Sequence, residues 1–234
     1  MKRLLLTLLV LGSLAGCDFM PGKPVLEKGM EPGAEVTNFN HLYTQNCAGC
    51  HGANGTLGAA RPLNDPLYLA LISPEDLRSH ITTGVPGTTA PAFARQAGGK
   101  LTDRQIEMLV EGIRSRWGDA EKFKNVALPP YSLRDAVDKG SRSGEPGRGA
   151  VAYRTYCAQC HGAEGTGGPK GGSVADPAYL ALVSDQSLRS SVIAGRTDLG
   201  MPDWRGYIPG KPMGDQEISD VVAWLSAKRR TEVP

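Results

Sequence analysis

The chain carries the pattern Cys-x-x-Cys-His twice, at residues 47–51 and 157–161. The similarity extends beyond the pattern, because residues 65–71 recur as residues 176–182 after a one-residue adjustment. A period of about 110 residues is that of a whole domain and not of a solenoid turn. The chain is therefore expected to fold as two copies of one small unit.

Each unit has the layout of a helical domain. A short helix leads into the pattern, a glycine-rich loop follows, and further helices end in a C-terminal helix that begins at Asp103 in the first unit and at Asp215 in the second. Apolar side chains follow each start at helical spacing: Ile106, Leu109, Val110 and Ile113, then Ile218, Val221, Val222 and Leu225. Thr102 or Asp103, and Asp215, are the expected N-caps. Strand signals are weak, so we predict a mainly α fold.

The repeated pattern is the attachment signature of a c-type haem, in which two thiols bond to the haem and the histidine binds its iron. The residues concerned are Cys47, Cys50, His51, Cys157, Cys160 and His161. A thioredoxin-like redox pair needs a flanking strand and helix, whereas both patterns run into glycine-rich loops. A four-cysteine zinc site would leave both histidines unexplained. The sequence therefore predicts two covalently bound haems c as cofactors.

The fifth cysteine, Cys17, belongs to an N-terminal signal. Lys2 and Arg3 precede an apolar run at residues 4–11, which is too short to span a bilayer as a mature helix. Residues 14–17, Leu-Ala-Gly-Cys, resemble a bacterial lipobox, which implies that Cys17 is acylated and becomes the first mature residue. An ordinary cleaved signal is the alternative. Several acyl chains anchor stably, so we expect a lipoprotein outside the cytoplasm, at the periplasmic face of the inner membrane.

Charge excludes one class of partner. The precursor has a formal net charge of +2. Loss of residues 1–16 removes Lys2 and Arg3 and no acidic residue, so the mature chain is formally balanced. A chain without a basic stripe is not expected to bind nucleic acid.

Taken together, the repeated pattern and its helical surroundings resemble the class I cytochrome c family, used twice in tandem. The resemblance covers residues 35–118 and 147–234. The expected organisation is a signal peptide at 1–16, a lipid-anchored tether at 17–34, domain 1 at 35–118, a linker at 119–146 and domain 2 at 147–234. The linker is long for a simple connection, so we expect it to pack across both domains.

The resemblance also implies a sixth iron ligand, usually a methionine followed by proline. Met201, between Gly200 and Pro202, has this setting in the second unit, and Met213 is the competitor. A thioether ligand raises the reduction potential of the haem.

The first unit departs from this pattern, because aligning Gly84 with Gly195 places Ala90 opposite Met201. Alanine cannot bind iron. Either another side chain takes its place, or the site is open, or a partner protein covers it. The candidate side chains are Met30, His41, His80 and Met108.

Other roles follow from the resemblance alone. A proline carbonyl after the motif is expected to orient the iron-binding histidine, and Pro62 and Pro169 are the candidates. Arg78 and Arg189 recur at matching positions and are candidates to bind haem propionates, although solvated helix arginines are an equal alternative. Tyr43 and Tyr153 are expected to pack on the haem.

These features predict an electron-transfer protein and not an enzyme. It would pass single electrons between redox partners of a respiratory or photosynthetic chain, as a membrane-tethered carrier or as a subunit of a membrane complex. The alternative is a haem enzyme or a gas- or peroxide-binding protein that acts at an open first haem, where a distal acid or base would be needed.

Overall fold

The computed structural model describes residue 33 and residues 36–229. Contacts divide the chain into the units Met1–Glu35 and Val36–Pro234, and every helix named below belongs to the second unit. The predicted signal peptide, Cys17 and Met30 lie outside the described residues.

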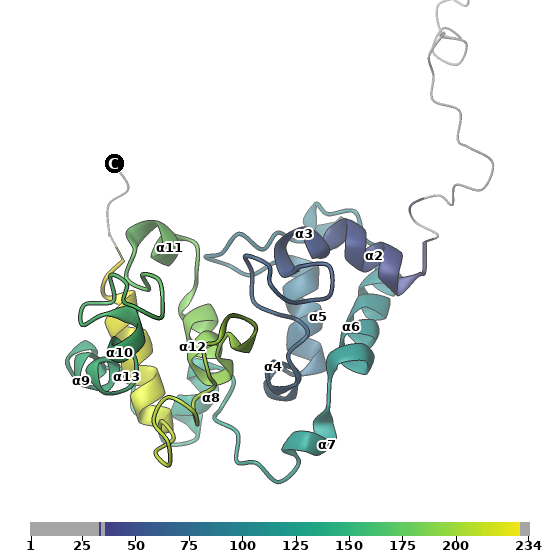
Figure 1. Cartoon of the computed structure of the whole chain (residues 1–234). Coiled ribbons are helices and arrows are strands. Elements are labelled where there is room, and N and C mark those ends of the chain that lie inside the picture. Colours follow the sequence, from purple (N-terminus) through teal and green to yellow (C-terminus); the bar gives the residue numbers. More distant parts are fainter. Residues whose placement is uncertain (1–32, 34–35, 230–234) are drawn as a thin grey trace, which may run out of the picture. The chain divides into compact units, whose positions relative to one another are not determined.

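Short helices joined by long loops make up the fold (Figure 1). In chain order they are α2 (Phe39–Asn46), α3 (Ala48–His51), α4 (Pro66–Leu71), α5 (Pro74–Thr83), η1 (Arg95–Ala97), α6 (Asp103–Trp117), α7 (Ala120–Phe123), α8 (Leu133–Asp138), α9 (Pro146–Tyr156), α10 (Ala158–His161), α11 (Pro177–Ala181), α12 (Asp185–Ala194), η2 (Thr197–Leu199) and α13 (Asp215–Ser226). Over the described ranges the backbone forms no strand, only two isolated bridges, Ala94 with Leu101 and Arg196 with Met201. The mainly α prediction is confirmed.

The internal repeat reappears in the order of the elements. The first repeat contains α2, α3, α4, α5, η1 and α6, and the second contains α9, α10, α11, α12, η2 and α13 in the same order. Helices α7 and α8 lie between them. Because each helix has a counterpart, the two repeats can be compared residue by residue.

Side-chain caps determine where several helices begin. Asp65 and Asp176 accept hydrogen bonds from the first N–H groups of α4 and α11, and a proline follows each of them. Thr102 caps α6 in a capping box, as expected. The expectation for Asp215 is wrong by one residue, because Gly214 is the N-cap of α13. Its N–H donates to the carboxylate of Glu217 at 2.8 Å, which leaves Asp215 as the first helical residue.

The first and last helices of each repeat cross closely, α2 against α6 and α9 against α13. In the first repeat a Cβ on Gly112 of α6 would lie 2.0 Å from the ring of Phe39 on α2. In the second repeat a Cβ on Gly149 of α9 would lie 2.0 Å from the main-chain oxygen of Asp220 and 2.7 Å from the Cβ of Trp224. Both crossings therefore require a glycine at the point of contact.

In the aligned repeats, the glycine at this crossing lies on the last helix of the first repeat and on the first helix of the second. Phe39 and Gly149 hold the same place in their repeats, and so do Gly112 and Trp224. In the first repeat the ring of Phe39 thus faces glycine on the last helix. In the second repeat the glycine is on the first helix and faces the main chain at Asp220 and the Cβ of Trp224, whose ring stacks on Tyr153 with centroids 4.1 Å apart.

The segment between the repeats contacts both of them. The buried guanidinium of Arg189 on α12 donates through Nε and Nη2 to the Pro130 oxygen, at 3.0 and 2.8 Å. Gln186 donates to the Tyr131 oxygen at 2.9 Å, and the Tyr131 ring packs on that of Tyr68 in α4, with centroids 6.5 Å apart. Residues 130 and 131 therefore join the two halves of the fold.

One further observation concerns the membrane. Within residues 36–229, no helix combines the length and the hydropathy needed to cross a bilayer.

The crossing of α9 and α13 yields a stability prediction. Gly149→Ala is expected to lower the free energy of unfolding by about 1–3 kcal/mol, because the added methyl meets main-chain atoms that cannot move alone. Urea unfolding followed by circular dichroism measures the change. Gly147→Ala on the same helix is the control, because its methyl would meet no main-chain atom within 4 Å and only the carboxylate of Glu145, at 3.1 Å. Equal stability of the two variants would contradict the prediction.

Candidate haem-binding sites

Both Cys-x-x-Cys-His patterns fold into the same one-turn structure. Cys47 ends α2 and precedes α3, on which Cys50 and His51 lie. The His51 N–H donates to the Cys47 oxygen at 2.9 Å, and the His161 N–H donates to the Cys157 oxygen at 3.0 Å. The turn brings the two thiols and the imidazole of each pattern together, because residues three and four apart share one face of a helix.

The thiols in the described part of the chain are all free. Burial raises the pKa of Cys47 to about 12, and the adjacent thiol of Cys50 contributes. Burial acts in the same way on Cys157, whose pKa also rises to about 12 beside Cys160. Each pattern therefore presents two thiols that no other protein group engages covalently.

The iron-binding candidates are held by main-chain carbonyls. Nδ1 of His51 lies 2.6 Å from the Arg61 oxygen, and Nδ1 of His161 lies 2.8 Å from the Gly172 oxygen. A carbonyl only accepts, so Nδ1 carries the proton and donates it, which leaves the Nε2 lone pair free. Burial lowers the pKa of His51 against the opposing effect of this hydrogen bond, and the charges of Arg61 and Arg196 lower it further. His51 is thus favoured in its neutral, metal-binding form.

The prediction that Pro62 and Pro169 supply these carbonyls is wrong. The acceptor is Arg61, just before the first proline, and in the second repeat it is Gly172, three residues after Pro169. The stretch between the histidine and the acceptor is one residue longer in the second repeat. The acceptor carbonyl has the same role in both repeats, whereas the proline lies at a different sequence separation from it. Glycine is also required there, because a Cβ on Gly171 would lie 2.6 Å from Cε1 of His161.

A buried tyrosine supports each pattern. The Tyr43 hydroxyl donates to the Gly52 oxygen at 2.8 Å, and the Tyr153 hydroxyl donates to the Gly162 oxygen at 2.9 Å. Each glycine directly follows the histidine of its pattern. The tyrosines therefore fix the end of the helix that carries the histidine. Their packing on the haem stays a prediction.

The loops after α5 and α12 have the same backbone course. Gly84 and Gly195 both have positive φ, 73° and 74°. A Cβ on Gly84 would lie 2.6 Å from the Ala90 oxygen, and a Cβ on Gly195 would lie 2.6 Å from the Met201 oxygen. The structure therefore places Ala90 in the first repeat where Met201 lies in the second.

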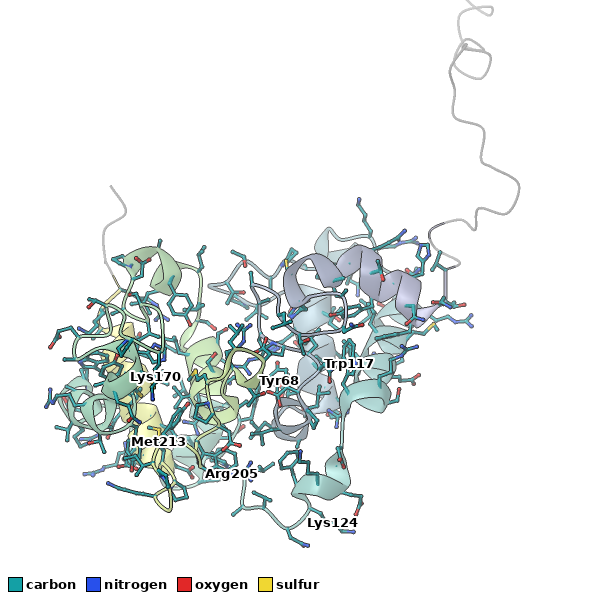
Figure 2. The ribbon with its side chains drawn as sticks, viewed as in Figure 1. Tyr68, Trp117, Lys124, Lys170, Arg205 and Met213 are labelled. Carbon is teal, nitrogen blue, oxygen red and sulfur yellow. The ribbon has the colours of Figure 1, made fainter. Side chains whose placement is uncertain are left out.

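The two methionines of the second repeat differ in their surroundings. Met201 is half-buried, and its loop is closed by two main-chain hydrogen bonds with Arg196, at 3.0 and 3.1 Å. Met213, labelled in Figure 2, belongs to the second repeat. It is buried, with an exposed fraction of 3%. Met201 therefore has the more accessible side chain of the two, and its ligation stays a prediction.

The candidates for a substitute ligand in the first repeat also differ. His41 is exposed on α2, and Met108 packs against the core from α6. His80 is half-buried on α5, one turn before Gly84 along the chain. Burial lowers its pKa, against the attraction of Asp76.

A second exchange between the repeats follows from this placement. The first repeat has His80 on the helix and Ala90 on the loop, and the second has Ser191 on the helix and Met201 on the loop. Each repeat thus offers one side chain able to bind iron at this pair of positions.

The two arginines predicted to hold propionates have protein partners. Arg78 forms an ion pair with Glu107 on α6, and Arg189 binds the linker at Pro130 and the Ser219 hydroxyl on α13. Sequence reasoning missed Arg61, whose Nη1 is buried without a hydrogen-bond partner. The second repeat has no arginine at the equivalent loop position, so comparison of the two repeats does not single out Arg61.

The residues at each pattern fit a c-type haem. The two free thiols suit the haem vinyl groups, and the imidazole, with its Nε2 available, suits the iron. In the first repeat a buried guanidinium with a free N–H is also present, which suits a carboxylate. In the second repeat the thiols and imidazole have the same arrangement.

Comparison with known proteins agrees with this donor set. A family model described as "Cytochrome C oxidase, cbb3-type, subunit III" matches residues 34–111 and 144–225, one segment in each repeat. The chain is 27% identical to the Cbb3-type cytochrome c oxidase subunit CcoP of Azospirillum sp. (strain B510), over 82% of this chain and 62% of that subunit. It thus spans less than two thirds of that relative.

Other similarities are more distant. The chain is 23% identical to the Cytochrome bc1 complex cytochrome c subunit of Mycobacterium tuberculosis (strain ATCC 25618 / H37Rv), over 99% of this chain and 76% of that subunit. A chain of the Kuenenia stuttgartiensis reducing HAO-like protein complex Kustc0457/Kustc0458 matches 82% of this chain and 96% of its own length, with a TM-score of 0.43 and 19% identity. This last likeness is too low to support an inference.

Proposed function

Because the chain belongs to the cytochrome family described as cytochrome c oxidase, cbb3-type, subunit III, we propose that each of its repeats carries one haem c and that the protein passes single electrons between partners of a respiratory chain. The observation that supports this most strongly is the pair of identical motif turns. In both, the histidine Nδ1 is engaged by a carbonyl and Nε2 is free.

The roles of the individual residues follow. Cys47 and Cys50 form thioethers with haem 1, and Cys157 and Cys160 form them with haem 2. His51 and His161 bind the respective irons, and the carbonyls of Arg61 and Gly172 hold the imidazole rings in place. Met201 is the sixth ligand of haem 2. The bound haem supplies the one-electron chemistry of its iron.

The protein's own contribution is to hold and shield these groups. One-electron transfer needs no general acid or base. No cluster of three or more His, Cys, Asp or Glu side chains suited to a metal ion occurs within the described ranges. Domain 1 at 35–118 and domain 2 at 147–234 are proposed as the two haem-binding domains, with 119–146 as the linker. The partners are redox proteins of a membrane respiratory complex, the kind of assembly that the relatives' names describe.

We further propose that Cys17 anchors the protein to the outer, periplasmic face of the inner membrane. The support is the sequence at residues 14–17 together with the basic and apolar residues before it. A tether confines the carrier near its partners and raises their effective concentration.

Haem content tests the central proposal. The purified full chain is expected to contain two covalently bound haems, measured as haem iron per chain after acid extraction of any free haem. Replacing Cys47 and Cys50 with alanine is expected to leave one, and so is replacing Cys157 and Cys160. A protein with no acid-resistant haem would refute the proposal.

Carbon monoxide tests the sixth ligands, since it binds ferrous haem only where a position is free. We propose that His80 takes the place of the missing methionine, so the unmutated, reduced protein is expected to bind none promptly. Met201→Ala is expected to open one haem and His80→Ala the other, as measured from visible spectra, while His41→Ala changes nothing. Prompt binding to one haem of the unmutated protein would contradict His80 ligation and favour gas- or peroxide-binding at haem 1, the alternative that Ala90 supports.

Fractionation of cells tests the anchor. The unmutated protein is expected in the membrane fraction and Cys17→Ser in the soluble extracytoplasmic fraction, with Ser13→Ala as the control that stays with the membrane. A Cys17→Ser protein that remains on membranes after a salt wash would contradict lipid anchoring.

A further inference from the structure

We propose that the side chains of Arg196 and Asp198 form a clamp through which the first repeat holds the Met201 loop of the second repeat in place. Arg196 is a positioning residue in this role and not an iron ligand, because it acts through the loop that carries Met201. The inference rests on the proposed function, in which Met201 is the sixth ligand of haem 2. Ligation at haem 2 then depends on contacts that the first repeat makes.

The main chain of Arg196 closes the Met201 loop. The Arg196 N–H donates to the Met201 oxygen at 3.1 Å, and the Met201 N–H donates to the Arg196 oxygen at 3.0 Å. The two residues therefore move together, and whatever holds Arg196 also holds Met201.

The side chain of Arg196 binds both repeats at once. Its Nε and Nη2 donate to the two carboxylate oxygens of Asp198, at 2.9 and 3.0 Å, and Nη2 also donates to the Gly58 oxygen of the first repeat at 3.0 Å. The pair is largely removed from solvent, with 18% of the arginine side chain and 5% of the aspartate side chain exposed. A two-pronged arginine–carboxylate pair fixes orientation as well as distance. The guanidinium is thus held rigidly against the first repeat.

Asp198 supplies the second contact with the first repeat. Its Oδ2 accepts a hydrogen bond from the Leu57 N–H at 3.0 Å. The hydrogen bonds from Arg196 lower the pKa of Asp198 against the effect of burial, and the Leu57 N–H lowers it further. The clamp therefore binds a donor at residue 57 and an acceptor at residue 58, two adjacent positions of one loop.

The loop that the clamp binds packs directly on the first motif turn. A Cβ on Gly58 would lie 2.2 Å from the Cys50 oxygen and 2.6 Å from the carbonyl carbon of His51. The clamp thus connects the loop of the proposed ligand of haem 2 with the turn that carries the proposed attachment site of haem 1.

The backbone of Leu57 is unusual in a way that the clamp explains. Leu57 is the only non-glycine residue with positive φ between residues 36 and 229, at 61°, and its counterpart in the second repeat is Gly167, at 109°. Leucine adopts this conformation less readily than glycine does. The Leu57 side chain is 71% exposed, so its own packing gives little support. The hydrogen bond to Asp198 stabilises the conformation from the other repeat.

The first repeat has no such clamp on its own loop. Val85 and Gly87 align with Arg196 and Asp198, and neither carries a charged side chain. The Val85 N–H donates to the Ala90 oxygen at 3.2 Å, but the Ala90 N–H turns to the Thr88 hydroxyl at 3.1 Å. The clamp therefore belongs to the loop that carries a methionine and is missing from the loop that does not.

The test is a titration of the ferric, full-length holoprotein with imidazole, which competes with methionine for ferric haem. Loss of the far-red absorption band of methionine-ligated ferric haem reports on haem 2 alone. In Arg196→Leu the apparent affinity of haem 2 for imidazole is expected to rise about tenfold, because the Met201 loop loses the hydrogen bonds of a buried charged pair.

Arg205→Leu is the matched control. Arg205, labelled in Figure 2, forms a similar two-pronged pair with Asp203 in the same repeat, at 3.0 and 2.6 Å, and its described hydrogen bonds all go to this aspartate. Loss of that pair is expected to leave the imidazole affinity unchanged.

A second comparison acts from the first repeat. Leu57→Val is expected to raise the imidazole affinity of haem 2 as well, because a β-branched residue resists positive φ and draws the N–H away from Asp198. Leu57→Gly is expected to leave it unchanged, because glycine adopts this φ freely and keeps the N–H.

Three results would each overturn the inference: an unchanged imidazole affinity in Arg196→Leu, an equal change in Arg205→Leu, or equal affinities in Leu57→Val and Leu57→Gly. If Arg196→Leu does not fold, Asp198→Ala is compared with Asp203→Ala in the same way. Absence of the methionine band in the unmutated ferric protein would instead refute Met201 ligation, which belongs to the proposed function.

Discussion

The hydrogen bond from each motif histidine to a carbonyl in the following loop is the contact on which the rest of the structure depends. It lies between Nδ1 and a main-chain oxygen, 2.6 Å away at His51 and 2.8 Å away at His161. It closes the glycine-rich loop against the motif turn and fixes which nitrogen remains free. The buried tyrosines, through Gly52 and Gly162, hold the other side of the same turn.

Around this shared contact, the two repeats carry different side chains at aligned positions. The ring and the glycine of the helix crossing have changed places between Phe39 with Gly112 and Gly149 with Trp224. At two aligned positions, the first repeat has His80 and Ala90 where the second has Ser191 and Met201. A guanidinium follows the first motif where the second has glycine. One backbone plan therefore supports two sites of different chemistry.

Sequence reasoning succeeded where the signal is local and repeated. The spacing of cysteines and histidine, the helical period after Asp103 and Asp215, and the internal alignment together predicted a mainly α tandem fold, because each depends on neighbours along the chain. It failed where the partner is distant. Arg78 and Arg189 match across the repeats, yet they meet Glu107 and Pro130, which only the folded chain brings near. Loop length moved the histidine acceptors away from the prolines, and Arg61 has no counterpart to draw attention to it.

The exchanged ring and glycine have a consequence for how such a chain assembles. Tandem domains of similar sequence are prone to trade equivalent helices while they fold. If α2 paired with α13, the ring of Phe39 would lie against the main chain at Asp220 and the Cβ of Trp224, where the fold has room only for Gly149. If α9 paired with α6, Gly149 would meet Gly112, and no side chain of this pair would fill the space between the helices. The two glycines therefore favour pairing of each first helix with the last helix of its own repeat.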